Sequence, residues 1–348
     1  METIQWIPLF LSLVLFSCTD NDNSPDKEIE QALNPKVEGK IFIGNKVNGG
    51  WILDLDTGHY SKIPNTDWDE NPNYPGLASF SAAALYYGNG EFVETIENCV
   101  VEFGNDKDCI VFHNNDGNIN GSFQISDIAL STARLSPDGT SVAITVENEG
   151  NPFKILHVYN RSGELMRVFD KRKINSDDFS WTTSNQIVYI SGQSIYVSNS
   201  DVPIITFRDE GIIPGEPSIS PDGTQVVFTL GEDTSQGVEG TIWLINIDGT
   251  GLRQLTTKEM DLPVTPSHKS AIWSPDGQWV FVVDGTSIEG NAYVVPADAQ
   301  KVELTQKRNT LAVPVLSYFR ETFEFQDNDP ISLSSQFGVN YGEIYWLP

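Results

Sequence analysis

The chain has 348 residues, of which 39% are hydrophobic and 11% aromatic, so it can bury a sizeable core and is not a disordered chain. Its 48 acidic residues against 21 Lys and Arg give a formal net charge of −27, which repels phosphate backbones and argues against nucleic acid as a partner. The same charge disfavours anionic membrane surfaces and polyanionic glycans.

Residues 1–17 predict a signal peptide. An apolar run extends from Ile7 to Phe16, which is too short to span a bilayer but has the length of a signal-peptide core. The residues Leu15-Phe16-Ser17-Cys18 resemble the bacterial lipobox, in which the cysteine is acylated after cleavage. The resemblance implies that Cys18 is lipidated and that the N-terminal lipid attaches the protein to a membrane. The alternative is a buried N-terminal strand or helix.

Residues 18–37 are polar and acidic, and they predict a solvated tether. Thr19 rather than Asp follows the cysteine, which by the enterobacterial sorting rule of lipoproteins implies the outer membrane. We therefore expect a bacterial cell-envelope protein that faces the periplasm or the cell surface.

Residues 38–348 predict a single all-β domain, because short alternating strands are separated by turn residues throughout. A Ser-Pro-Asp-Gly turn followed by an apolar strand occurs three times, within Leu135–Thr145, Ile219–Leu230 and Trp273–Val283, and a degenerate copy spans Phe179–Ile190. In such a turn the proline fixes φ, the aspartate bonds nearby amides and the glycine takes the left-handed conformation. We expect these structural roles for Pro137, Asp138, Gly139, Pro221, Asp222, Gly223, Pro275, Asp276 and Gly277.

A second pattern follows each copy of the Ser-Pro-Asp-Gly segment. It consists of a strand with an aromatic residue, a polar turn and a short strand, as in TIWLINIDGTGLRQLT from Thr241. Repeats of roughly 40 to 50 residues with four short strands predict a β-propeller of four-stranded antiparallel sheets. Together the two patterns resemble the WD40-like repeat of the TolB propeller family over about residues 38–348. That repeat occurs in scaffold proteins, peptidase gating domains and polysaccharide lyases, so it implies the fold and leaves the function open.

The sequence allows six or seven blades. Residues 40–64 could take an inner strand from residues 311–319, which gives six blades. Alternatively residues 311–348 form a blade of their own, with strands near Ala312, Phe323 and Ile344. We prefer seven, because the terminal EIYWLP matches the opening of the second pattern.

Besides Cys18 the chain has only Cys99 and Cys109. In an oxidising envelope we expect this pair to form a disulfide, with two free buried thiols as the alternative. A metal site on the pair is disfavoured, because zinc ligands usually lie closer together and no neighbouring His or Cys completes a set.

Candidate sites for chemistry are few. Oxygen-bearing side chains alternate at Asp67, Asp69 and Asn71, which could bind Ca²⁺ from a curved loop, although the glycine and final glutamate of an EF-hand are missing. The alternative is a solvated loop between blades. The four histidines, His59, His113, His157 and His268, lie in different repeats and form no metal-binding motif.

The sequence lacks the common motifs of serine hydrolases and nucleotide-binding enzymes. There is no G-x-S-x-G elbow, P-loop or dinucleotide fingerprint. Trp181 and Trp273 recur at one position of the repeat, which predicts packing between blades, whereas Trp51 and Trp68 are candidates for surface contacts.

We therefore expect a lipid-anchored envelope propeller that binds another envelope protein or peptide and has no catalysis of its own. One alternative is a metal-assisted lyase or hydrolase with its site in the central channel. The other is a receptor for a sugar or another small ligand.

Overall fold

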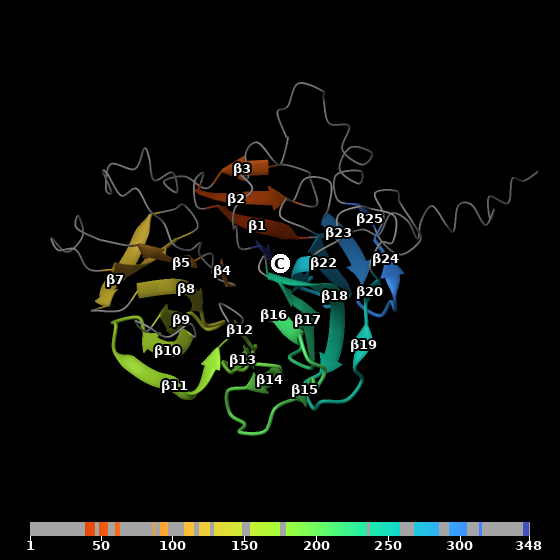
Figure 1. Cartoon of the computed structure of the whole chain (residues 1–348). Helices are drawn as coiled ribbons and strands as arrows, with labels where there is room; N and C mark the ends of the chain where they lie inside the picture. Colours follow the sequence, from red (N-terminus) through yellow and green to blue (C-terminus); the bar gives the residue numbers. More distant parts are fainter. Residues whose placement is uncertain are drawn as a thin grey trace, which may run out of the picture.

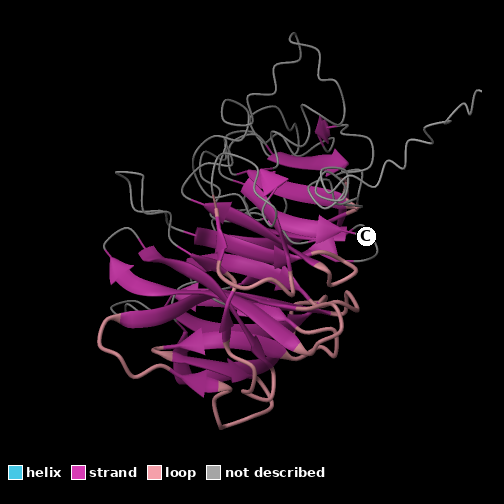
Figure 2. Cartoon of the chain, turned by 90° about the vertical axis from the view of Figure 1, so that its right-hand side faces the viewer, coloured by secondary structure: helices cyan, strands magenta, loops and turns pink. Residues whose placement is uncertain are grey.

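The computed structural model is a ring of β-sheets around a central axis (Figure 1). The residues that the structure describes are 39–45, 49–54, 60–62, 86–87, 91–96, 108–114, 118–125, 129–147, 154–174, 179–234, 237–257, 268–284, 292–304, 313–314 and 344–347. Every regular element among them is a β-strand (Figure 2), so the predicted all-β class is confirmed. A helix with the length and hydropathy to cross a membrane is not found in these ranges.

The described strands form six four-stranded sheets, which we number as blades 1 to 6 around the ring and describe from the inner to the outer strand. Blade 1 consists of β26 (Ile344–Leu347), β1 (Lys40–Asn45), β2 (Gly49–Asp54) and β3 (Tyr60–Lys62). Blade 2 consists of β4 (Tyr86–Tyr87), β5 (Glu91–Ile96), β6 (Asp108–His113) and β7 (Ile119–Ile125). Blade 3 consists of β8 (Ala129–Leu135), β9 (Ser141–Glu147), β10 (Lys154–Asn160) and β11 (Leu165–Ile174).

The other three blades repeat this order. Blade 4 consists of β12 (Phe179–Trp181), β13 (Ile187–Ser191), β14 (Ser194–Val197) and β15 (Ile205–Thr206). Blade 5 consists of β16 (Ile212–Ile219), β17 (Gln225–Thr234), β18 (Gly237–Asn246) and β19 (Arg253–Gln254). Blade 6 consists of β21 (His268–Trp273), β22 (Trp279–Asp284), β23 (Ala292–Pro296) and β25 (Val313–Pro314). A parallel pair, β20 (Thr256–Thr257) and β24 (Val302–Glu303), links blades 5 and 6.

The C-terminal strand β26 closes the ring. It pairs antiparallel with β1 in the register Lys40↔Leu347 to Ile43↔Ile344. It also contacts β21 of blade 6 and β4 of blade 2, so blade 1 joins the last blade of the chain to the second one. The two ends of the described chain therefore share one blade, and neither end can leave without opening the ring.

The preferred prediction of a separate blade from residues 311–348 is wrong for the strands that the structure describes. Val313–Pro314 pairs with β23 as the outer strand of blade 6, and Ile344–Leu347 is the inner strand of blade 1. The six-blade alternative correctly provides an inner strand beside residues 40–64, but the strand comes from residues 344–347 rather than 311–319. Phe323 lies outside the described residues.

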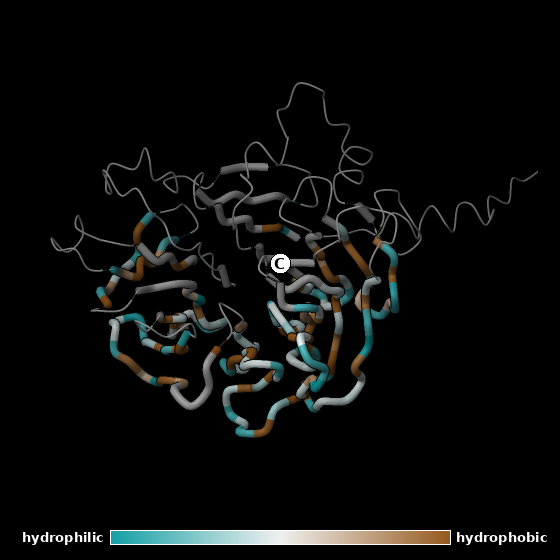
Figure 3. The backbone as a smooth tube through the Cα atoms, viewed as in Figure 1, coloured by the Kyte–Doolittle hydropathy of each residue, from teal (hydrophilic) through white to brown (hydrophobic). Residues whose placement is uncertain are grey.

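Each described hydrophobic cluster includes residues of two neighbouring blades. Between blades 4 and 5, for example, Val188 and Ile190 pack with Val226 and Phe228, and all four are fully buried. Neighbouring blades cover both faces of a central strand, which is why Ile187–Ile190 is a continuous apolar run with every residue buried. Short polar segments separate such runs along the chain (Figure 3). Each fully buried Val, Ile or Phe contributes about 1.5–3 kcal/mol, and no single blade could bury these faces alone.

Candidate functional site: the turn face

Two sets of turns meet at one end of the ring, which we call the turn face. The inner set joins the first two strands of blades 3 to 6 and consists of Ser136–Gly139, Thr182–Asn185, Ser220–Gly223 and Ser274–Gly277. The outer set joins the third and fourth strands of blades 3 to 5 at residues 160–164, 198–204 and 246–252, and in blade 6 it follows the third strand at residues 297–301, which lead to β24. The sets touch, because the amides of Ile247 and Ala297 donate to the carbonyls of Thr224 and Gln278, each at 2.8 Å.

The three Ser-Pro-Asp-Gly turns share one hydrogen-bond network. The glycine amide donates to the serine carbonyl, the serine hydroxyl donates to the aspartate Oδ1, and the serine Oγ accepts from the amide that opens the next strand, all at 2.5–2.9 Å. The glycine φ angles are 69°, 74° and 70° at Gly139, Gly223 and Gly277. These are left-handed values that favour glycine, so the same four residues specify the same turn in each blade.

The degenerate copy in blade 4 builds this turn from other residues. Asn185 has a φ of 57° and donates its amide to the Thr182 carbonyl at 3.0 Å, so it takes the place of the glycine. Thr182 Oγ1 accepts from the Gln186 amide at 2.9 Å and lies 3.0 Å from the Ser184 hydroxyl, as the serine does elsewhere. Asn is one of the few residues other than glycine that adopts the left-handed region routinely.

Hydrogen bonds join the inner turns across the blade boundaries. The Asn185 side-chain amide donates to Asp138 Oδ2 of blade 3 at 2.6 Å. The indole of Trp181 donates to the Arg134 carbonyl at 2.8 Å, and that of Trp273 donates to the Ser218 carbonyl at 3.2 Å. The predicted packing of these tryptophans between blades is confirmed, and each indole fixes the distance between two inner strands.

The carboxylates of Asp138 and Asp222 are held in the ionised form. Burial opposes ionisation of Asp138, but hydrogen bonds from Ser136, Thr140 and Asn185 outweigh it and lower its pKa below 3.8. For Asp222 the largest cause is the hydrogen bond from Ser220, and this pKa is lowered as well. Since the donors come from the turn and its neighbours, these carboxylates hold the turn face in shape.

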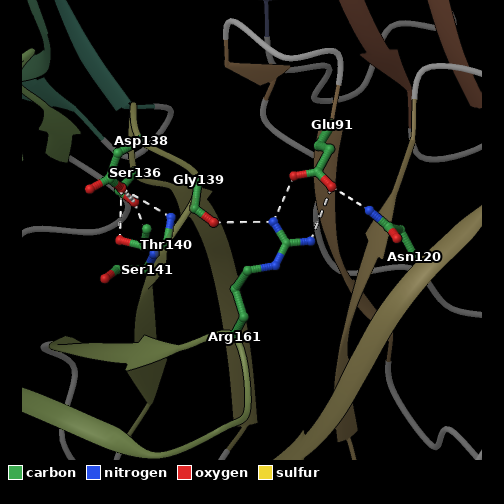
Figure 4. Close-up of polar contacts among 8 residues, drawn as sticks. All are labelled: Glu91, Asn120, Ser136, Asp138, Gly139, Thr140, Ser141 and Arg161. Atoms are coloured by element: carbon green, nitrogen blue, oxygen red, sulfur yellow. Dashed lines mark hydrogen bonds and ion pairs between the residues drawn. The ribbon is translucent and has the colours of Figure 1, made fainter.

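An ion pair that sequence analysis did not find joins blades 2 and 3 at the turn face (Figure 4). The Arg161 guanidinium donates to Glu91 Oε2 at 2.6 Å, to Glu91 Oε1 at 3.2 Å and to the Gly139 carbonyl at 3.1 Å. It also lies 4.5 Å from the centre of the Phe112 ring, and Asn120 donates its side-chain amide to Glu91. Because 70 residues separate Arg161 from Glu91, no local pattern indicates the pair.

Outer turns also approach the preceding blade closely. Gly249 of blade 5 has a φ of 85°, and a Cβ on it would lie 2.6 Å from the Ile204 carbonyl oxygen of blade 4. Gly163 of blade 3 has a φ of 84°, and its Cβ would lie 2.9 Å from the Phe123 ring of blade 2. The glycines in these turns therefore allow blade-to-blade contact as well as the turn itself.

The predicted cysteine and histidine sites are only partly described. Cys109 is fully buried in β6 opposite Ile96, and Cys99 lies outside the described residues, so the disulfide stays a prediction. His113 is fully buried in β6, while His157 is half-buried, with Nδ1 3.1 Å from the Tyr159 hydroxyl. Burial lowers the pKa of His157, which keeps the ring neutral.

Of the other predicted residues, His268 and Trp51 lie in described strands. His268 begins β21, and His59 lies outside the described ranges, as do Cys18, Trp68 and the candidate calcium ligands Asp67, Asp69 and Asn71. Trp51 lies in β2 opposite Ile43 of β1. Within the described ranges no three His, Cys, Asp or Glu residues gather as a possible metal site.

Solved structures share the fold. A GH74 enzyme from Niastella koreensis is 12% identical with a TM-score of 0.53, over 77% of this chain and 43% of that one. TolB from Acinetobacter baumannii is 17% identical with a TM-score of 0.49, over 78% of this chain, which spans 65% of the TolB length. The periplasmic gluconolactonase PpgL from Pseudomonas aeruginosa is 13% identical with a TM-score of 0.47, over 74% of this chain and 78% of that one.

No protein family and no curated protein matches the chain in sequence. At these identities the structural likeness concerns the fold alone. Together with the ring of four-stranded sheets, it confirms the predicted β-propeller.

Proposed function

We propose that this chain is a lipid-anchored cell-envelope propeller that binds another envelope protein or peptide on its turn face. Catalysis is not part of this role. The lipobox resemblance at Cys18 and the acidic segment that follows it support an anchored domain held away from the membrane.

The proposal rests on the hydrogen bonds and the ion pair that hold the turns of neighbouring blades in fixed positions. Bonds between blades at Asn185–Asp138, Trp181–Arg134 and Arg161–Glu91 fix neighbouring turns relative to one another. A surface that is already ordered loses little conformational entropy when a partner binds, so a modest contact area can give useful affinity. Polar side chains that are exposed on this face, such as Thr183 and Gln278, would make the contacts.

The test is chemical crosslinking in intact cells, followed by affinity purification of the full-length chain and mass spectrometry. We expect one dominant envelope partner whose crosslinks map to the turn face. Thr183→Arg combined with Gln278→Arg should abolish its capture, because both side chains are exposed there.

The matched control is Glu210→Arg. Glu210 is exposed in the connection between β15 and β16, at the opposite end of the blades, and this variant should capture the partner normally. Cys18→Ala should lose the partner through loss of the anchor. Crosslinks that map elsewhere, or catalytic turnover by the purified chain, would contradict the proposal.

A further inference from the structure

The outer strand of blade 3 differs from the outer strands of the other blades. β11 is 10 residues long, whereas β7 has 7 residues, β3 has 3, and β15, β19 and β25 have 2 each. Among the described strands only β10 pairs with β11, so the backbone N–H and C=O groups of its outer edge have no strand partner within the described residues. A long free edge is a template for another strand.

Exposed apolar side chains gather on this strand. Of the five large apolar residues that are exposed in the described ranges, three lie on β11: Leu165 at 47%, Met166 at 60% and Val168 at 37%. A fourth, Val202, is 72% exposed in the adjacent turn of blade 4. Arg167 ties the two blades together here, because its guanidinium donates to the Ser198 carbonyl at 2.6 Å.

The second half of β11 is basic. Leu156 pairs with Phe169 and Lys154 pairs with Ile174, so the register shifts here and Asp170–Lys173 forms a bulge of four residues opposite Ile155. The bulge contains Lys171, Arg172 and Lys173 and one acid, in a chain whose net charge is −27. The sequence therefore places three cations in succession on this half of the strand.

Cations and bulges on an edge can serve to prevent strand pairing. That purpose does not account for Leu165, Met166 and Val168, which leave apolar surface exposed beside the free backbone. An apolar edge that continues into a basic bulge is complementary to an extended segment with alternating apolar and acidic residues.

We propose that the outer edge of β11 binds an extended acidic segment of a partner protein, which adds as a further strand beside Leu165–Phe169. The positive charge that the sequence places at residues 171–173 favours a segment that carries carboxylates. Backbone hydrogen bonds provide affinity, and the charges select an acidic partner. This surface borders the outer turns but not the inner turns, where Thr183 and Gln278 lie, so its failure would leave the proposed role of those two side chains intact.

The test uses the full-length chain and a labelled ten-residue peptide of alternating valine and glutamate, with a valine–lysine peptide as the control. Fluorescence anisotropy at physiological salt should show binding of the glutamate peptide and at least tenfold weaker binding of the lysine peptide. Hydrogen exchange of the Leu165–Phe169 amides should slow when the glutamate peptide binds.

Lys171→Glu combined with Lys173→Glu should weaken binding of the glutamate peptide at least tenfold. Lys301 is an exposed cation three blades away, and Lys301→Glu should not change the affinity for the glutamate peptide. Met166→Ser combined with Val168→Ser tests the apolar half without altering charge and should also weaken binding several-fold. Circular dichroism verifies that each variant is folded.

Equal affinity for the two peptides, insensitivity to charge reversal, or protection outside residues 165–174 would overturn the proposal. So would protection of β11 in the chain alone that disappears on dilution or on deletion of residues 19–38. Those results would show that a second copy or the chain's own acidic segment occupies the edge.

Discussion

The side-chain amide of Asn185 donates a 2.6 Å hydrogen bond to the carboxylate of Asp138, which lies 47 residues earlier and in the preceding blade. Asn185 also occupies the left-handed position that glycine holds in the other inner turns, with a φ of 57°. One residue therefore both shapes its own turn and ties that turn to its neighbour.

Asn185→Gly separates these two functions, because glycine keeps the left-handed turn and removes the amide. We expect a loss of about 0.5–1 kcal/mol in the free energy of urea unfolding for Asn185→Gly. The loss should be about 1 kcal/mol larger for Asn185→Ala, which also strains the backbone. In the double variant with Asp138→Ala the effects should be less than additive. Fully additive losses would contradict the bond.

Acid should destabilise the fold through the turn carboxylates. The folded-state pKa values of Asp138 and Asp222 lie below 3.8, so both groups contribute stability above that pH. This contribution is lost as the pH falls from about 4 through the folded-state pKa values. In urea unfolding, Asp222→Asn should have a lower free energy of unfolding than the parent protein near neutral pH. Its free energy of unfolding should also depend less on pH in that window. An unchanged pH dependence would contradict the assignment.

Arg161 should be sensitive to conservative replacement. Arg161→Lys keeps the charge but cannot donate to both Glu91 oxygens and the Gly139 carbonyl together, so we expect a loss of about 1–2 kcal/mol. Glu91→Gln should cost a similar amount, because that side chain is only 13% exposed. A double-mutant cycle from thermal unfolding measures their coupling, and coupling near zero would contradict a structural role for the pair.

Two glycines with nearly equal φ distinguish backbone strain from steric contact. Gly249 has a φ of 85°, and a Cβ added to it would lie 2.6 Å from the Ile204 carbonyl oxygen, while Gly211 has a φ of 82° and open space around it. We expect Gly211→Ala to cost about 1 kcal/mol from strain alone. Gly249→Ala should cost at least twice as much in urea unfolding, and equal losses would contradict the close approach.

The predicted Cys99–Cys109 disulfide can be tested by thiol labelling. Cys109 is fully buried, and Ile96, its neighbour on the adjacent strand, lies three residues before Cys99. This closeness supports a disulfide between Cys99 and Cys109. Denatured protein that has not been reduced should leave both thiols unlabelled, and reduction should expose both. Reduction should also cost about 3 kcal/mol of stability for so short a loop. Labelling before reduction would contradict the disulfide.

Much of the fold follows from local sequence. The Ser-Pro-Asp-Gly turns contain their own hydrogen bonds between residues two to five apart, so they form the same structure wherever they occur. Alternating apolar residues then indicate the strands, and the repeat length indicates a propeller. Even the degenerate turn at Thr182–Asn185 follows, since Asn tolerates the left-handed conformation.

Only the tertiary structure determined how the ring closes and which turns are tied together. The strand within GEIYWLP has an apolar pattern that suits a third strand or an inner strand equally well, and in the structure it is the inner strand that pairs with β1. The Arg161–Glu91 pair likewise depends on two blades lying side by side. Turns are determined by interactions between near neighbours in the chain, whereas strand order and contacts between blades depend on which edges and faces remain free after the blades have formed.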